Sequence, residues 1–168
     1  YLLSFLTRRS SVLPLENAYI ADFTVDNAND SQPVLLASVE NDDNGAGPFS
    51  AAYGTDGMEQ PVALNGTSSV FRLSFTTSGT GVALATSGTG DIFSQISFEY
   101  VSGPVTTTPT ITLIDYTPGA DPQQVTVRAT GFAASSNYRL RINGGSSGVQ
   151  DIYGNTLAAD QVFLLDPF

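Results

Sequence analysis

The chain has 168 residues and a net charge of −10, and it contains no histidine, cysteine or lysine. These absences remove the usual general base, the thiol nucleophiles, nearly all zinc sites, Schiff-base catalysis and the phosphate-binding P-loop. With six arginines against sixteen acidic residues, nucleic acid is disfavoured as a partner, because its binding relies on basic side chains that neutralise phosphates. Catalysis by carboxylate groups stays possible, but most acidic residues fall in expected turns or on expected solvent-facing sides of strands. We therefore expect a protein that is not an enzyme.

The composition favours β-structure. Apolar residues make up 41% of the chain and aromatic residues 10%, whereas only 13% of the residues are charged. Much of the polarity comes from Ser, Thr, Asn and Gly, and Thr joins Val, Ile, Phe and Tyr among the residues that suit a pleated, half-buried surface. The longest apolar stretches, such as 34–37 and 162–165, are too short for a membrane-spanning helix. We expect an all-β protein without a transmembrane helix.

Residues 1–16 form an apolar N-terminal segment with few polar residues, and Pro14 is expected to interrupt any regular secondary structure there. Two interpretations stay open. The segment is an ordinary first strand or short helix that packs on its own domain, or it is an arm that docks on a neighbouring subunit by adding a strand to an exposed sheet edge. In the second interpretation the assembly interface consists of Leu2, Leu3, Phe5, Leu6, Leu13 and Leu15.

Residues 17–104 are predicted to form a first β-sandwich domain. Apolar and polar residues alternate with a period of two in several segments, which is typical of half-buried strands. These strands are expected at 19–25, 34–39, 70–75 and 96–101. The stretch 40–48 is an expected surface loop, because its Asp, Asn, Gly and Pro residues favour turns. Residues 49–66 are expected to form loops around short strands, and residues 76–90 contain at most one weak strand.

A Thr-rich segment at 105–110 (VTTTPT) is a predicted linker, because it is extended and contains a proline that cannot donate to a sheet ladder. It places a domain boundary between 17–104 and a second β domain at 111–168. Strands are expected in the second part at 111–116, 124–129, 138–142 and 161–165. Short strands at this spacing, without a helical apolar pattern, indicate a sandwich or a barrel.

One segment carries a family resemblance. A strand of the pattern Y-x-L-x-I is followed by D-x-x-G-N-x-L and a closing strand. The matching residues are Tyr138, Leu140 and Ile142, then Asp151, Gly154, Asn155 and Leu157, then Val162 and Phe163. Over residues 126–163 the chain thus resembles the second half of bacterial Ig-like domains found in surface-layer proteins, adhesins and phage structural proteins.

The turn in this motif has a structural explanation, since Gly154 and Asn155 tolerate a left-handed conformation and Asp151 can accept hydrogen bonds from nearby backbone N–H groups. Roughly 60 residues follow the linker, whereas an Ig-type sandwich has about 100. The C-terminal domain is therefore truncated, or it borrows strands from residues 1–104.

A fainter resemblance covers residues 69–101. The strands Phe71–Phe75 and Ile96–Phe98 resemble those of jelly-roll modules in carbohydrate-binding proteins and phage spikes, although the alternating strands of any sandwich produce a similar pattern. Together these observations predict an all-β, antiparallel β-sandwich of jelly-roll or Ig-like type, built as one sandwich or as two packed β domains.

Calcium is the ion that the sequence would suit best, and no other cofactor is expected. Asp42 and Asp43 are the candidate ligands, because hard cations take carboxylate and carbonyl oxygens from acidic loops. The spacing is not that of an EF-hand, and a solvated acidic loop is the simpler interpretation.

Two functions from different classes follow. The first is a non-enzymatic structural subunit of a virion, such as a decoration, spike or tail protein, or of an extracellular surface assembly, which forms homo-oligomers or larger assemblies through the arm. The second is a carbohydrate-binding or adhesion module, in which polar loops or exposed tyrosines contact a glycan. Most tyrosines, however, are expected in the core with the hydroxyl group at its edge.

Overall fold

In the computed structural model of the protein, β-strands dominate the described residues, which are 32–47, 49, 53–54, 58–77, 82–118 and 122–168. The elements are β1 (Leu35–Asp42), β2 (Glu59–Val62), β3 (Ser68–Thr76), β4 (Ile96–Ser102), β5 (Thr110–Thr117), β6 (Gln123–Thr130), β7 (Asn137–Ile142), the 3-10 helix η1 (Gly145–Ser147) and β8 (Gln161–Pro167). The predicted all-β class is confirmed. The apolar segment 1–16, its six interface residues and the strand expected at 19–25 lie outside the described residues.

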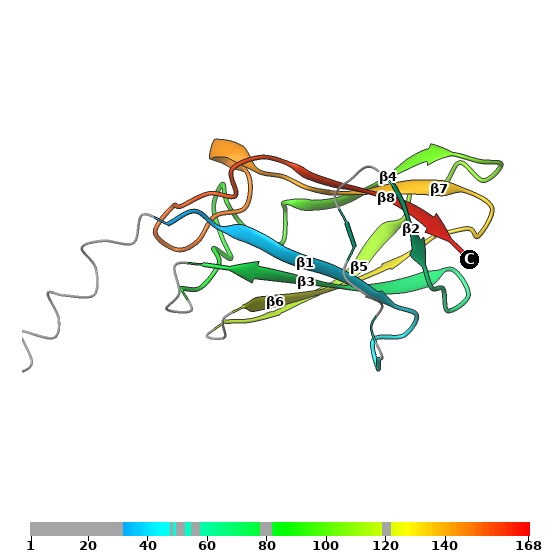
Figure 1. The fold of residues 1–168 in the computed structure, drawn as a ribbon, viewed down its shortest axis with the longest axis horizontal. Coiled ribbons are helices and arrows are strands. Elements are labelled where there is room, and N and C mark those ends of the chain that lie inside the picture. Colours follow the sequence, from blue (N-terminus) through cyan, green and yellow to red (C-terminus); the bar gives the residue numbers. More distant parts are fainter. Residues whose placement is uncertain (1–31, 48, 50–52, 55–57, 78–81, 119–121) are drawn as a thin grey trace, which may run out of the picture. The chain divides into compact units, whose positions relative to one another are not determined.

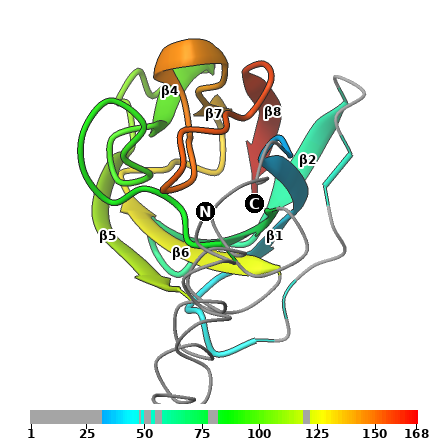
Figure 2. The ribbon, with the colours of Figure 1, turned by 90° about the vertical axis from the view of Figure 1, so that its left-hand side faces the viewer.

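Two four-stranded sheets pack face to face (Figure 1, Figure 2). The first sheet has the strand order β1-β3-β6-β5, and the second has the order β2-β8-β7-β4. The pair β2–β8 is parallel, with Glu59 opposite Leu164, and the other strand pairs are antiparallel. The predicted β-sandwich is therefore confirmed.

Each sheet combines strands from both halves of the sequence. β3 lies between β1 and β6, and β4 pairs with β7. Residues 32–168 consequently form one compact unit. The segment 105–110, expected to be an interdomain linker, leads from β4 in one sheet into β5 in the other, and Thr110 is already the first residue of β5. In this fold it connects two strands of one sandwich, because strands from both sides of it pair with each other.

The core follows from the period-two alternation of the strands. Val125, Val127 and Ala129 of β6 are fully buried, as are Tyr138 and Leu140 of β7. Residues between them in each strand point away from the core and are partly or fully exposed. β6 and β7 therefore place their apolar residues on the face that meets the opposite sheet.

An aromatic cluster joins the two sheets. The ring of Phe71 in β3 lies 5.1 Å from that of Phe98 in β4, measured between ring centroids. Phe132, in the β6–β7 connection, makes edge-to-face contacts with Phe98 at 5.4 Å and with Tyr138 at 5.2 Å. These offset geometries are the favoured ones for aromatic pairs. The cluster ties β3 of the first sheet to β4 and β7 of the second.

Strand β2 lies in the region 49–66, where short strands among loops are expected, but its four residues contain Pro61 and show no alternation that would have located it. Its position depends on distant partners. β2 pairs with β8, and the backbone N–H of Phe168 donates to the carbonyl of Val62 at 3.1 Å. Pro61 fits here because β2 is an edge strand, in which a missing N–H group is tolerated.

Candidate interaction surface

The predicted calcium ligands lie where β1 ends. Glu40, Asn41 and Asp42, expected in a loop, are the last three residues of β1 and pair with β3. The carboxylate of Asp42 is nearly buried, and its Oδ2 accepts hydrogen bonds from the N–H groups of Gly45 at 2.6 Å and Gly47 at 2.9 Å. The bond from Gly47 is the largest of the effects that lower the pKa of Asp42. Asp42 thus stabilises the turn that follows it.

The metal assignment itself stays a prediction. Asp43 is half-buried in the same turn. Within the described residues, no group of three or more His, Cys, Asp or Glu side chains is close enough to hold a metal ion. The described geometry therefore gives Asp42 a structural role, in which its oxygen accepts backbone N–H groups.

The turn after β1 covers part of the outer face of the first sheet. Val70 of β3 points away from the core but is almost fully buried, because Gly45 packs against its side chain. Gly45 has a positive φ of 83°, and a Cβ there would lie 3.3 Å from Cγ1 of Val70. Arg128 of β6 donates from Nη2 to the carbonyl of Asn44 at 3.0 Å. The turn is consequently fixed to two strands of this sheet.

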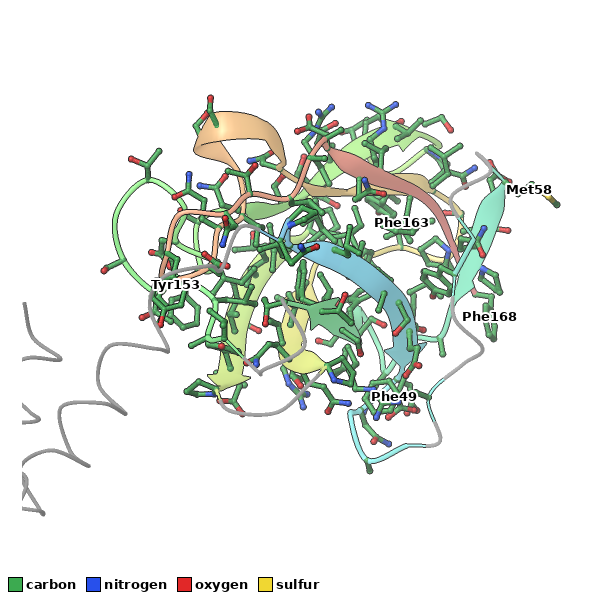
Figure 3. All side chains as sticks on the ribbon, turned by 60° about the vertical axis from the view of Figure 1, so that its left-hand side comes forward. Phe49, Met58, Tyr153, Phe163 and Phe168 are labelled. Atoms are coloured by element: carbon green, nitrogen blue, oxygen red, sulfur yellow. The ribbon has the colours of Figure 1, made fainter. Side chains whose placement is uncertain are left out.

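An ion pair and a cation–π contact also lie on the outer face of the first sheet, next to the turn after β1. Arg72 of β3 pairs with Glu40 of β1, and its guanidinium lies 4.1 Å from the ring centroid of Phe49. Stacking of this kind suits the planar guanidinium group. The contact places Phe49 over the outer face of the first sheet, where Figure 3 labels it.

In the turn at 151–155, Asp151 has the structural role that the sequence predicts for it. Its Oδ1 accepts the N–H groups of Tyr153 and Asn155, each at 2.9 Å, and its Oδ2 accepts Asn155 Nδ2 at 2.8 Å. Gly154 has the expected left-handed conformation, with a φ of 85°. Among the described residues all positive φ angles belong to glycines, so Asn155 contributes its side-chain amide and not a left-handed backbone.

Three segments meet at this end of the sandwich. Ala85 N–H donates to the carbonyl of Gln150 at 2.8 Å, and Ile152 N–H donates to that of Ala83 at 3.0 Å. Val34, just before β1, forms a parallel bridge with Leu157. The adjoining side chain of Tyr153 is 49% exposed, and in Figure 3 it lies at the opposite end of the sandwich from Phe168.

Charged side chains gather on the outer face of the second sheet. Glu99 of β4 contacts Arg139 at 3.2 Å and Arg141 at 3.1 Å, and Arg141 also contacts Asp160 at 2.8 Å. The hydrogen bond to Glu99 is the main cause of the raised pKa of Arg141. These groups are about one-third exposed or more, so solvent screens the pairs and each contributes little to stability. Glu99 therefore has two arginine partners on this face.

The sheet edges differ in how they are protected. At β1, the carbonyl of Val39 accepts the N–H of Tyr53 at 2.8 Å. β2 is short and contains proline, and β4 has a bulge between Tyr100 and Ser102. β5 has eight residues without Pro or Gly. Within the described part of the chain, no strand pairs with its outer edge.

β5 also presents an apolar side chain beside its open edge. The pairing with β6 is irregular between Ile111 and Leu113 and regular from there to Thr117. Leu113, opposite Arg128, is 51% exposed on the outer face. Sequence reasoning predicted the strand but not its edge position, because strand order depends on pairing with distant β6.

No family model, curated protein or solved structure matches this chain. The described residues include no helix that is long and apolar enough to cross a membrane. The resemblances noted over 126–163 and 69–101 therefore stay predictions, and the function is argued from the strands and their surfaces.

Proposed function

We propose that this protein is a non-enzymatic, Ig-like structural subunit of a virion or an extracellular surface assembly, which docks through its apolar N-terminal segment. The strand order carries this proposal. An Ig constant-type sandwich has seven strands, A to G, with the order A-B-E-D in one sheet and C-F-G in the other. If β2 is an added edge strand, the remaining strands in chain order give A-B-E-D and G-F-C here. Because domains with this architecture are common on cell surfaces, a surface role is an inference by analogy.

A second feature supports the Ig-like assignment. Ig sandwiches often have a tyrosine near the start of strand F whose hydroxyl group hydrogen-bonds to the backbone a few residues upstream. Tyr138 is the second residue of β7, the strand that corresponds to F, and its hydroxyl oxygen accepts the N–H of Ala133 at 3.0 Å. Tyr138 is also part of the Y-x-L-x-I pattern on which the resemblance rests.

The acidic residues support a role without catalysis. Asp42 and Asp151 accept hydrogen bonds from the backbone of their own turns, and Glu99 pairs with two arginines. A general acid or base needs a carboxylate that reaches a substrate with an appropriate pKa. These three carboxylates instead have partners that hold them in turns and on a sheet face.

Light scattering tests the assembly role directly. The full chain and a variant without residues 1–16 are each measured by multi-angle light scattering over a range of concentrations. We expect the full chain to form oligomers and the shortened chain to be a folded monomer, with circular dichroism as the check of folding. If both chains are stable monomers at every concentration, the proposal fails.

Glycan binding is the second candidate, because the exposed ring of Tyr153 lies on a loop at one end of the sandwich. Exposed aromatic rings supply the flat apolar surface on which a sugar ring packs. A glycan array probed with the full chain, with and without calcium, tests this role. Tyr153→Ala should remove binding, whereas Phe168→Ala, at the opposite end, should keep it. A blank array would contradict this candidate.

A further inference from the structure

We propose that the open edge of β5 is the acceptor for the N-terminal segment of a second copy, in which residues 1–16 of one molecule add a strand beside Leu113–Thr117 of its neighbour. This inference rests on the proposed assembly function and assigns the surface that the arm contacts. The two partners are therefore copies of the same chain, joined head to tail.

The first support is the difference between β5 and the other three edges. β1 already accepts a hydrogen bond from Tyr53, and β2 is a four-residue strand with Pro61. β4 presents Glu99, which is paired with two arginines, on its outer face. Proline, short length and charge are common ways to prevent edge-to-edge pairing. β5 has one charged residue, Asp115, and is neither short nor interrupted by proline. Its one irregularity, between Ile111 and Leu113, precedes the regular part from Leu113 to Thr117.

The second support is the chemistry of β5 itself. Its sequence, TITLIDYT, combines β-branched and aromatic residues with one charge and no Pro or Gly. Segments of this composition pair readily with an added strand. Leu113 lies in the outer row of side chains and is half exposed. A docked apolar strand would place its own side chains next to Leu113 and remove both apolar surfaces from water.

Charge distinguishes the arm from a second copy of β5 as the occupant. Residues 32–168 contain twelve acidic residues and four arginines, a net charge of −8, whereas residues 1–16 contain Arg8, Arg9 and Glu16, a net charge of +1. Pairing of β5 with β5 would bring together two strongly acidic units. The arm is the segment whose net charge complements the sandwich, so electrostatics favours it at this edge.

The connecting chain is long enough. Residues 17–31 separate the arm from the described sandwich, and fifteen residues span up to about 50 Å when extended, at about 3.3 Å each. The regular part of β5 has five residues, about 17 Å at about 3.4 Å each. The arm can therefore reach an edge on a neighbouring molecule while its own sandwich stays outside that neighbour.

Cysteine cross-linking tests the contact, because the chain has no native cysteine. One preparation carries Leu6→Cys in the arm, and a second carries Leu113→Cys on β5. The two are mixed, treated with a short bis-maleimide and analysed by mass. Matched preparations with Leu35→Cys on β1 or Val101→Cys on β4 replace the second partner, since these side chains are also exposed.

The proposal expects a covalent heterodimer of Leu6→Cys with Leu113→Cys, at a yield at least roughly tenfold above that with the β1 or β4 variant. A cross-linked Leu113→Cys homodimer would instead assign the edge to β5–β5 pairing. Equal yields at all edges would make the contact non-specific. In a chain with both substitutions, cross-linking within one molecule only would place the arm on its own sandwich. Each of these three results overturns the inference.

A charge substitution gives an independent measurement. Leu113→Lys should weaken oligomer formation of the full chain by at least roughly tenfold in light scattering, whereas Leu35→Lys, with the same charge change and similar exposure, should change it less than about twofold. Oligomers that persist without any cross-link at β5 would overturn this inference and leave the proposed function intact. A full chain that is always monomeric would overturn both.

Discussion

The two outer strands of the first sheet show how similar strands acquire different surfaces. β1 and β5 each have eight residues and one outward-facing leucine, Leu35 at 53% and Leu113 at 51% exposure. β1 is fixed from both sides, by Asn41 on the inner face and by Tyr53 at its edge. β5 is fixed from the inside by Tyr116 and is open at its edge in the described part of the chain. An edge is therefore protected by what the rest of the chain places beside it and not by the strand's own length or apolar content.

The largest expected effect is at the inner anchor of β1. Asn41 Nδ2 donates to Ser69 Oγ at 2.6 Å and to the carbonyl of Val70 at 3.0 Å, and its Oδ1 accepts the N–H of Ala63 at 2.7 Å. Because these groups are buried, Asn41→Ala should lower the free energy of unfolding by about 3 kcal/mol. Urea denaturation measures this change.

Ala37→Ser, on an exposed position of the same strand, is the control and should change the free energy of unfolding by less than about 0.5 kcal/mol. If Asn41→Ala costs no more than this control, the amide does not anchor β1.

The next effect concerns the inner anchor of β5. Tyr116 donates from its hydroxyl to Gln123 Oε1 at 2.8 Å and accepts the N–H of Leu84 at 2.8 Å. Tyr116→Phe should cost about 1–2 kcal/mol, because both bonds are lost while the ring stays. Urea denaturation at neutral pH measures the loss.

The same tyrosine predicts a loss of stability in alkali. Burial raises the pKa of Tyr116 in the folded protein, so the unfolded chain ionises first, near pH 10. Its contribution is complete below that pH and falls as the pH rises towards the folded pKa. The wild-type free energy of unfolding should therefore decrease more steeply than that of Tyr116→Phe above about pH 10. Parallel pH profiles for the two proteins would contradict this prediction.

A smaller effect, at the opposite end of the pH scale, concerns the turn after β1. Asp42→Asn should cost about 1 kcal/mol at neutral pH, because the carboxylate that accepts the Gly45 and Gly47 N–H groups loses its charge. Since the hydrogen bond from Gly47 lowers the folded pKa of Asp42, its contribution is present above the unfolded pKa of about 3.9 and is lost as the pH falls through the lower folded pKa.

The check is the free energy of unfolding measured from pH 7 to pH 2. Asp43→Asn changes the net charge equally and serves as the matched control. A wild-type profile that resembles that of Asp42→Asn throughout the acid range would show that the turn does not depend on the charged form of Asp42.

The smallest effects are expected at the two exposed leucines. Leu113→Lys and Leu35→Lys should each change the thermal stability of the sandwich by less than about 0.5 kcal/mol, because both side chains are already half in water. Thermal melts at low protein concentration, where assembly does not contribute, measure this. A large loss for one of them would mean that the two strands differ in packing and not only in what covers their edges.

Strong alternation made several strands predictable. β3, β6, β7 and β8 coincide with predicted segments because every second residue is apolar and faces the core. β2 was not predictable in the same way, since Pro61 and the flanking polar residues give no alternation and the strand depends on pairing with β8. The segment 105–110 has the composition of a linker, and only the pairing of β3 with β6 and of β4 with β7 places it inside one sandwich.

The candidate sites also differ in whether their contacts could be predicted from nearby residues. The turn around Asp151 was predictable, because the partners of this aspartate lie within four residues. Asp42 was predicted as a calcium ligand from its acidic neighbours, and its described contacts are to glycine N–H groups in the next turn. The part that Asn41 plays depends on Ala63 and Ser69, which are more than twenty residues away. No local pattern marks such a contact.

By itself the sequence determined the class of the protein and most of its strands, because composition and period-two alternation are local properties that each segment carries alone. It also showed that the chain contains no His, Cys or Lys and so lacks the chemistry that these side chains supply. The tertiary structure decided that residues 32–168 form one sandwich, that β2 lies beside β8, and that β1 is covered while the outer edge of β5 has no partner strand in the described residues. These outcomes depend on which distant strands pair, and pairing is settled by the burial of a shared core and not by any one segment.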